Sequence, residues 1–146
     1  MEIIKPSSLE FLKKYLNNSS PTGYEIEGQK IWIEYLKNYV DNFITDSYGT
    51  AVGVINKEAQ FKLVIEAHSD EISWYVNYIT ENGLIYVIRN GGSDHQIAPS
   101  KDVDIHTKNG IIKGVFGWPA IHTRKPSKEE SPKIDNIFID VGAKDK

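Results

Sequence analysis

The sequence comprises 146 residues, 40% of them hydrophobic, which is enough to bury the core of one ordinary domain or of two small lobes. Its net charge at pH 7 is −3, and its one cationic cluster, at Arg124, Lys125 and Lys128, is interrupted by Glu129 and Glu130. Because nucleic-acid binding requires a continuous basic surface, we expect no nucleic-acid partner.

The sequence contains no cysteine, which excludes disulfide bonds, thiolate metal ligands and a cysteine nucleophile. No segment approaches the roughly 18 apolar residues that a membrane-spanning helix requires. The amino-terminal residues also lack the basic region and long apolar region of a signal peptide. These features predict a cytoplasmic protein that has no membrane partner.

The first 16 residues have the pattern of an amphipathic helix. Ser7 and Glu10 have the spacing of a capping box, in which the serine side chain caps the helix amino terminus. Leu9, Leu12 and Leu16 then recur with helical periodicity. The sequence therefore predicts a helix that begins at Ser7 and carries these leucines as an apolar stripe, with Phe11 and Tyr15 beside it.

A second helix is predicted from about residue 25 to about residue 40, after a loop rich in turn residues at 17–23. Ile33, Leu36 and Val40 mark its buried face. Glu25 and Glu27 favour a helix that begins near residue 25, because acidic side chains stabilise the positive end of the helix dipole.

The remaining apolar runs are short and are bounded by turn residues, which is typical of strands. We predict three strands before residue 70, at 43–45, 51–55 and 61–65. Five more are predicted after it, at 72–79, 84–89, 103–107, 111–116 and 137–141. Two of the intervening turns contain Asn-Gly, the strongest short signal of a hairpin. The predicted fold class is an α/β segment, with two helices and then strands of a mixed sheet, followed by a small all-β, barrel-like domain.

A candidate metal or acid–base site follows the third predicted strand, in the stretch FKLVIEAHSDEI. Here the apolar run is followed by His68, Ser69, Asp70 and Glu71. Functional groups gather beyond the carboxyl ends of strands in α/β sheets. A neutral imidazole can bind zinc while a neighbouring carboxylate orients the ring. On spacing alone, His-x-Asp fits a solvated turn as well as it fits a metal site.

The other histidines, His95, His106 and His122, are scattered along the chain, and His106 is predicted to be an exposed strand residue. Asp70 and Glu71 are neighbours, so on a strand their side chains would point to opposite faces. This argues against a glycoside hydrolase centre that is built on these two carboxylates.

Several motifs occur in an order that resembles a known family. They are SSPTGYE at 19–25, DSYGT at 46–50, EAHSDEI at 66–72, Gly91-Gly92, GVFG at 114–117 and IDVGA at 139–143. This set resembles the amino-terminal portion of the dinuclear metallo-aminopeptidases of the glutamyl and deblocking type, which form tetrahedral particles. The resemblance extends from about Leu9 to Ala143.

The resemblance implies that residues 1–71 are the amino-terminal part of an α/β peptidase catalytic domain. Residues 72–146 would then be most of an inserted, β-rich dimerisation domain. His68 is implied as a metal ligand, and Asp70 as the catalytic carboxylate that orients it. The family further implies two divalent metal ions, zinc or cobalt, in a complete active site, a peptide substrate and a homo-oligomer.

Two departures from the family pattern bear on function. Ser73 stands where the family commonly has glycine, which is a local change. The family's bridging aspartate, general-base glutamate, other acidic ligands and final histidine have no counterpart in these 146 residues. Because a catalytic zinc needs about three protein ligands, we expect a fragment that is inactive alone. The alternatives are a non-catalytic oligomerisation or binding module and, more weakly, a glycoside hydrolase.

Overall fold

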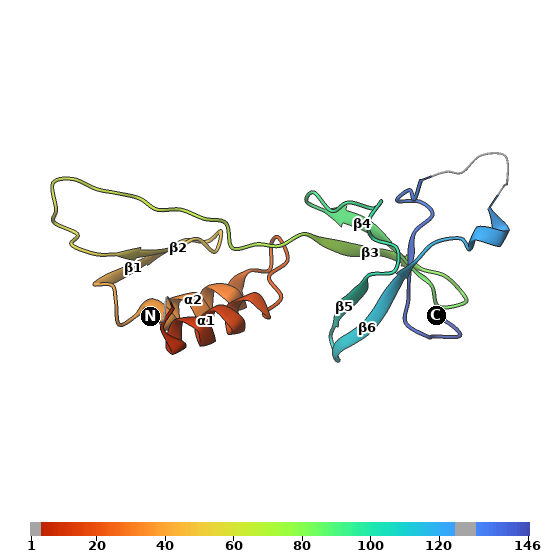
Figure 1. Ribbon diagram of the computed structural model, residues 1–146, viewed down its shortest axis with the longest axis horizontal. Helices are drawn as coiled ribbons and strands as arrows, with labels where there is room; N and C mark the ends of the chain where they lie inside the picture. The colour runs from red at the N-terminus through yellow and green to blue at the C-terminus, as the bar shows by residue number, and fades with distance from the viewer. Residues whose placement is uncertain (1–3, 125–130) are drawn as a thin grey trace. The chain divides into compact units, whose positions relative to one another are not determined.

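The computed structural model describes residues 4–124 and 131–146 (Figure 1). The chain divides after Glu71 into two compact units, residues 1–71 and residues 72–146. Lys125 and Lys128 of the cationic cluster, with the two glutamates that interrupt it, lie outside the described residues. Within the described part of the chain, no helix is long and apolar enough to span a membrane.

The first unit begins with the two predicted helices, α1 (Pro6–Leu16) and α2 (Ile26–Leu36). The predicted capping box is wrong: the N-cap residue is Lys5, and it makes no hydrogen bond through its side chain. Proline occupies the first turn instead, where its missing N–H costs nothing because that position has no partner within the helix. The second helix is shorter than predicted, because Lys37 is already its C-cap.

The predicted leucine stripe of α1 is not its buried face. Leu9, Leu12 and Leu16 are 41%, 40% and 70% exposed. The two helices instead meet through aromatic rings, with Phe11 stacked on Tyr35 at a centroid distance of 4.0 Å. This stacking sets the rotation of α1, and the leucines consequently face outward.

Two further predicted strands of this unit form a hairpin, β1 (Asn42–Thr45) paired antiparallel with β2 (Ala51–Val54). The third predicted strand, at 61–65, is wrong. This segment pairs with no strand among the described residues, and Phe61, Leu63 and Ile65 are 80%, 77% and 91% exposed. A strand requires backbone hydrogen bonds to a neighbour, so apolar residues with strand propensity do not make a strand by themselves.

The second unit is an antiparallel five-stranded sheet with the strand order β3-β4-β7-β6-β5. Its strands are β3 (Ser73–Ile79), β4 (Ile85–Asn90), β5 (Asp102–Thr107), β6 (Gly110–Gly117) and β7 (Phe138–Asp140). Each lies within two residues of a predicted strand at both ends. The predicted fold class, an α/β segment followed by a barrel-like β domain, is confirmed.

The core of the second unit forms where the last strand enters the middle of the sheet. Ile139 of β7 pairs with Ile85 of β4 on one side and with Phe116 of β6 on the other. All three are buried, together with Ile137, which has no exposed surface. Fully burying an aliphatic or Phe side chain of this size contributes about 1.5–3 kcal/mol. This cluster therefore contributes much of the free energy that stabilises the folded β domain.

Candidate functional site

The residues that follow the irregular segment at 61–65 are held by the loop between α1 and α2. Ser20 and Glu71 exchange two hydrogen bonds: Glu71 N donates to Ser20 O at 2.9 Å, and Ser20 N donates to Glu71 Oε1 at 2.8 Å. Pro21 and Glu71 form an isolated parallel bridge. The candidate site is thus positioned by this loop and not, as predicted, by the end of a strand.

A glycine in α2 lets the loop approach the helix. A Cβ atom on Gly28 would lie 2.5 Å from Oγ of Ser20, which is closer than real Cβ contacts allow. Ser20 is only 6% exposed, and its Oγ accepts a hydrogen bond from Asn18 Nδ2 at 3.0 Å. The absence of a side chain at residue 28 therefore allows Ser20 to pack against the helix.

Asp70 connects this loop to His68. One carboxylate oxygen, Oδ2, accepts a hydrogen bond from the Thr22 hydroxyl at 2.6 Å. The other, Oδ1, lies 3.0 Å from Nδ1 of His68. The hydrogen bond from Thr22, supported by the one from His68, holds the pKa of the Asp70 carboxyl below its usual value. Asp70 is therefore an ionised acceptor at neutral pH.

The surroundings of His68 determine which ring nitrogen carries the proton. Nδ1 faces two acceptors, the carboxylate oxygen and the backbone carbonyl oxygen of Asp70, each at 3.0 Å. Neither can donate, so the neutral ring must carry its proton on Nδ1. The lone pair then lies on Nε2, and the side chain is 85% exposed. This is the state in which an imidazole binds a metal ion.

A shallow hollow of about 240 Å³ beside His68 brings three of the sequence motifs together. Its lining residues are Glu25, Gln29, Tyr48, Gly49, Thr50, Ala67, His68, Ser69 and Asp70. They come from the ends of SSPTGYE and DSYGT, from EAHSDEI, and from α2. Motifs that are far apart in the sequence thus contribute to one surface next to the candidate ligand.

The DSYGT turn is closed by hydrogen bonds among its own residues. Asp46 Oδ1 accepts hydrogen bonds from the backbone N–H groups of Tyr48 at 2.9 Å and Thr50 at 3.0 Å. These bonds, the one from Thr50 above all, hold the pKa of the Asp46 carboxyl below its usual value. Gln29 Nε2 donates to Gly49 O at 3.0 Å and ties the turn to α2. Asp46 therefore shapes the hollow, and its carboxylate is not part of the lining.

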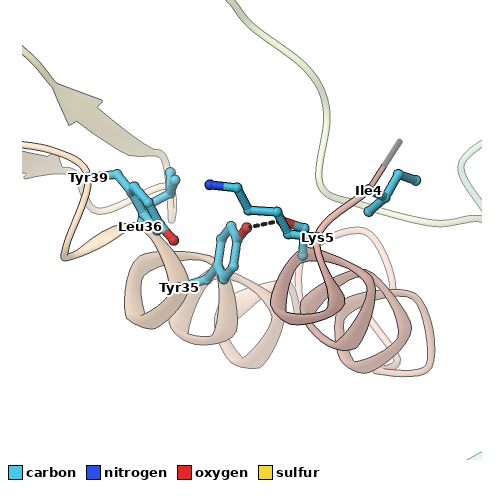
Figure 2. A pocket seen from close by; sticks show the side chains of 6 residues that line it. Ile4, Lys5, Tyr35, Leu36 and Tyr39 are labelled. Atoms are coloured by element: carbon cyan, nitrogen blue, oxygen red, sulfur yellow. Dashed lines mark hydrogen bonds between the residues drawn. The ribbon is translucent and has the colours of Figure 1, made fainter. Parts of the chain in front are cut away.

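A larger hollow, of about 450 Å³, lies over the two helices (Figure 2). It is lined by Ile4, Lys5, Ser8, Tyr35, Leu36 and Tyr39. Its polar contact is the hydrogen bond between the hydroxyl groups of Ser8 and Tyr35, at 2.8 Å. None of these residues belongs to a motif of the candidate site, and the two hollows share no lining residue.

The other histidines belong to the second unit. His95 contacts the guanidinium group of Arg89, and His122 lies exposed in a 3₁₀ turn. His106 is exposed on β5, as predicted. Among the described residues, no group of three or more His, Cys, Asp or Glu side chains is placed to hold a metal ion. His68, with Asp70 as its orienting carboxylate, fits one ligand of a metal site.

Sequence reasoning predicted the pairing of His68 with Asp70 but missed Thr22. The composition of the segment that contains Thr22 predicts only a loop. Its hydroxyl reaches a carboxylate 48 residues away, and local pattern gives no sign of such a contact. The sequence signal that includes Thr22 is the SSPTGYE motif, in which Thr22 is the fourth residue.

Comparison with known proteins identifies the family. Residues 49–146 match the family model of the M42 glutamyl aminopeptidases. The chain belongs to this family. Its members are metal-dependent peptidases, and the matched residues include His68 and Asp70 as well as the whole β domain.

Individual relatives extend the M42 likeness toward the amino terminus. Lysyl aminopeptidase of Pyrococcus furiosus is 30% identical over 137 residues, which cover 92% of this chain and 39% of the relative. A crystal structure of the TET aminopeptidase from a marine-sediment archaeon, Thaumarchaeota archaeon, has a TM-score of 0.91 and 24% identity. It shares the fold over 97% of this chain and 40% of its own.

A further structure connects the M42 fold with assembly. TET1 peptidase of Pyrococcus horikoshii has a TM-score of 0.74 and 27% identity, over 94% of this chain and 41% of its own. That peptidase can assemble into a tetrahedron or a large octahedral shell. This chain spans about two fifths of the length of each of these three proteins.

Proposed function

We propose that this chain supplies one metal ligand, His68, to the two-metal centre of an aminopeptidase that removes amino-terminal residues from peptides. The observation that carries the proposal is the hydrogen bonding of His68 Nδ1 to two acceptors of Asp70. This arrangement leaves the Nε2 lone pair for a divalent ion, zinc or cobalt. Membership of a metal-dependent peptidase family supports the same reading.

Each of the two residues has a distinct task in this proposal. The bound ions would polarise the scissile carbonyl and activate a water molecule. His68 would hold one ion through Nε2, while Asp70 would accept the Nδ1 proton, fix the plane of the ring and raise its basicity. The low pKa of the Asp70 carboxyl keeps it ionised for that task.

One histidine does not make a catalytic centre, because a catalytic zinc is held by about three protein ligands. The described residues place no such group together. We therefore propose that the remaining ligands and the general base come from outside these 146 residues. On this account the 146-residue chain alone does not hydrolyse peptides.

The proposal assigns the two units to different tasks. Residues 1–71, which contain His68, would be the amino-terminal part of the catalytic domain. Residues 72–146 would be a β domain that mediates homo-oligomer formation. The assembly of the Pyrococcus horikoshii peptidase supports a homo-oligomer. A cytoplasmic location stays a prediction from the sequence.

An activity assay tests the proposal directly. A protein of the length of the relatives, carrying this sequence, should hydrolyse aminoacyl anilides only when zinc or cobalt is present. His68→Ala should abolish this activity and remove bound metal, and His106→Ala, at an exposed position on β5, should leave both unchanged. A metal-loaded protein that is inert on all aminoacyl anilides would refute the proposal.

A non-catalytic oligomerisation module is the second candidate. It is favoured by the exposed apolar side chains of the second unit, which include Tyr75, Val76 and Tyr78 on β3. This reading predicts oligomers in light scattering and no stoichiometric zinc in elemental analysis. Tight zinc binding that is lost in His68→Ala would count against it.

The weakest alternative, a glycoside hydrolase, would use Asp70 and Glu71 as its carboxylate pair. In the structure these carboxylates bind different partners: Asp70 contacts His68 and Thr22, and Glu71 accepts the N–H of Ser20. These contacts give Asp70 an orienting role and Glu71 a structural one. Hydrolysis of a β-glucan by the 146-residue chain would favour this alternative over the peptidase.

A further inference from the structure

We propose that Thr22 is a positioning residue for His68: its hydroxyl fixes the Asp70 carboxylate in the orientation that keeps the His68 proton on Nδ1. The inference deepens the proposed function, because it concerns the same metal ligand. It can nevertheless be tested on the metal-free chain, independently of any activity.

The two oxygens of Asp70 have separate partners. Oδ2 accepts the Thr22 hydroxyl at 2.6 Å, and Oδ1 lies 3.0 Å from His68 Nδ1. The terminal torsion of an aspartate is broad and roughly two-fold, so an unanchored carboxylate samples many orientations. A short bond to one oxygen removes that freedom and aims the other oxygen at the ring.

The hydroxyl of Thr22 is itself held in place. The backbone N–H of Thr22 donates to Glu71 O at 3.4 Å, beside the hydrogen bonds between Ser20 and Glu71. Beyond it, Tyr24 N donates to Pro21 O at 2.7 Å, and Gly23 N donates to Glu25 Oε1 at 2.7 Å. Threonine is also β-branched, which restricts its χ1 torsion. The donor is therefore oriented before any ligand arrives.

A purely structural role is the competing explanation, because the same hydrogen bond also connects the loop to residues 70–71. The two roles predict different observables. A structural link affects the stability of the first unit and leaves the ring of a folded His68 unchanged. A positioning role changes the tautomer equilibrium of His68 even in a folded variant, because Nδ1 then has one fixed acceptor, the Asp70 carbonyl oxygen, in place of two, and the Nδ1–H form is stabilised less.

The test compares Thr22→Val, which keeps the shape and removes the hydroxyl, with Thr22→Ser, which restores it. Long-range ¹H–¹⁵N NMR spectra of the histidine rings in the metal-free 146-residue chain report the tautomer. They are recorded about two units above the ordinary histidine pKa of ~6.5. His68→Gln assigns the signal, and His106, exposed on β5, is the internal control.

We expect His68 to be predominantly Nδ1–H in the wild type and in Thr22→Ser. In Thr22→Val the Nε2–H form should gain population at its expense, while His106 stays unchanged. A folded Thr22→Val chain with the wild-type tautomer would overturn the inference. If Thr22→Val does not fold, Thr22→Ala, which also lacks the hydroxyl, takes its place: a gain of the Nε2–H form supports the positioning role, and the wild-type tautomer overturns it.

The outcomes separate this inference from the proposed function. The expected tautomers together with a full-length protein that is inert would refute the peptidase and leave the positioning role standing. An unchanged tautomer in folded Thr22→Val together with metal-dependent hydrolysis would do the reverse.

Discussion

Ser20 and Glu71 form a reciprocal pair: the backbone N–H of each donates to an oxygen of the other, at 2.8 Å and 2.9 Å. Glu71 directly follows Asp70, so the pair holds the backbone beside Asp70 against the loop that carries Thr22. Glu71 follows His68 and Asp70 closely in the sequence, but its role in this structure is to hold the loop at 19–25 in place. We call its two hydrogen bonds to Ser20 the clamp.

Removing the Glu71 carboxylate should loosen this clamp. Because the acceptor is charged but the residue is exposed, we expect Glu71→Ala to lower the free energy of unfolding of the first unit by about 1 kcal/mol. Glu71→Gln keeps an acceptor oxygen and should lose less. Hydrogen exchange of the Ser20 amide measures the effect, and equal protection in all three proteins would contradict the clamp.

Adding a methyl group at Gly28 should displace the loop. A Cβ there would lie 2.5 Å from Ser20 Oγ, and overpacking typically costs about 1–3 kcal/mol. Replacing a helical glycine by alanine would otherwise gain about 1 kcal/mol. We therefore expect Gly28→Ala to be neutral or destabilising in urea denaturation followed by circular dichroism.

The exposed helix position Lys30 provides the matched control for Gly28. Lys30→Ala changes only a surface pair with Glu27 and should shift stability by less than about 0.5 kcal/mol. A Gly28→Ala protein that is clearly more stable than the wild type would show that the loop does not pack against the helix as described.

The DSYGT turn should respond to acid through Asp46. Its folded-state pKa is depressed by backbone N–H donors, so its stabilising effect is present above the unfolded pKa of ~3.9 and is lost as the pH falls through the folded pKa. Asp46→Asn should therefore destabilise the chain at pH 7 and have a smaller effect at pH 2–3. A carboxyl ¹³C titration of Asp46 with a midpoint at or above ~3.9 would contradict this.

Truncation in the core of the second unit should be costly. Ile137 has no exposed surface, so Ile137→Ala should lower the free energy of unfolding by about 2–5 kcal/mol. Ile111 is 56% exposed on β6, and Ile111→Ala should cost less than about 1 kcal/mol. The fluorescence of Trp74, which packs edge-to-face on Phe116 at 5.3 Å, reports this unit. Similar midpoints for both variants would contradict the assigned core.

Much of the fold could be predicted from the sequence because its signals are local. Asn-Gly turns and period-two apolar runs indicated the hairpins of the β domain, and helical periodicity indicated α1 and α2. The prediction failed where the structure of a segment depends on contacts with residues far away in the sequence. Residues 61–65 have strand propensity but pair with no strand among the described residues, and the leucines of α1 are outward because Phe11 stacks on Tyr35.

The candidate site shows the same division. His68 and Asp70 are two residues apart, so their pairing follows from a short motif. Thr22 reaches Asp70 across 48 residues, and only the folded loop brings its hydroxyl to the carboxylate. A contact at that separation is made by the fold of the unit, and the spacing of residues along the sequence does not indicate it.

Anomalous diffraction from zinc tests the central claim most directly. Crystals of a protein of the length of the relatives, grown with zinc, should show an anomalous peak about 2.0–2.1 Å from Nε2 of His68. Nδ1 should stay hydrogen-bonded to Asp70, as it is at 3.0 Å here. Zinc bound at Nδ1, or a fully loaded protein with no peak at His68, would contradict the account.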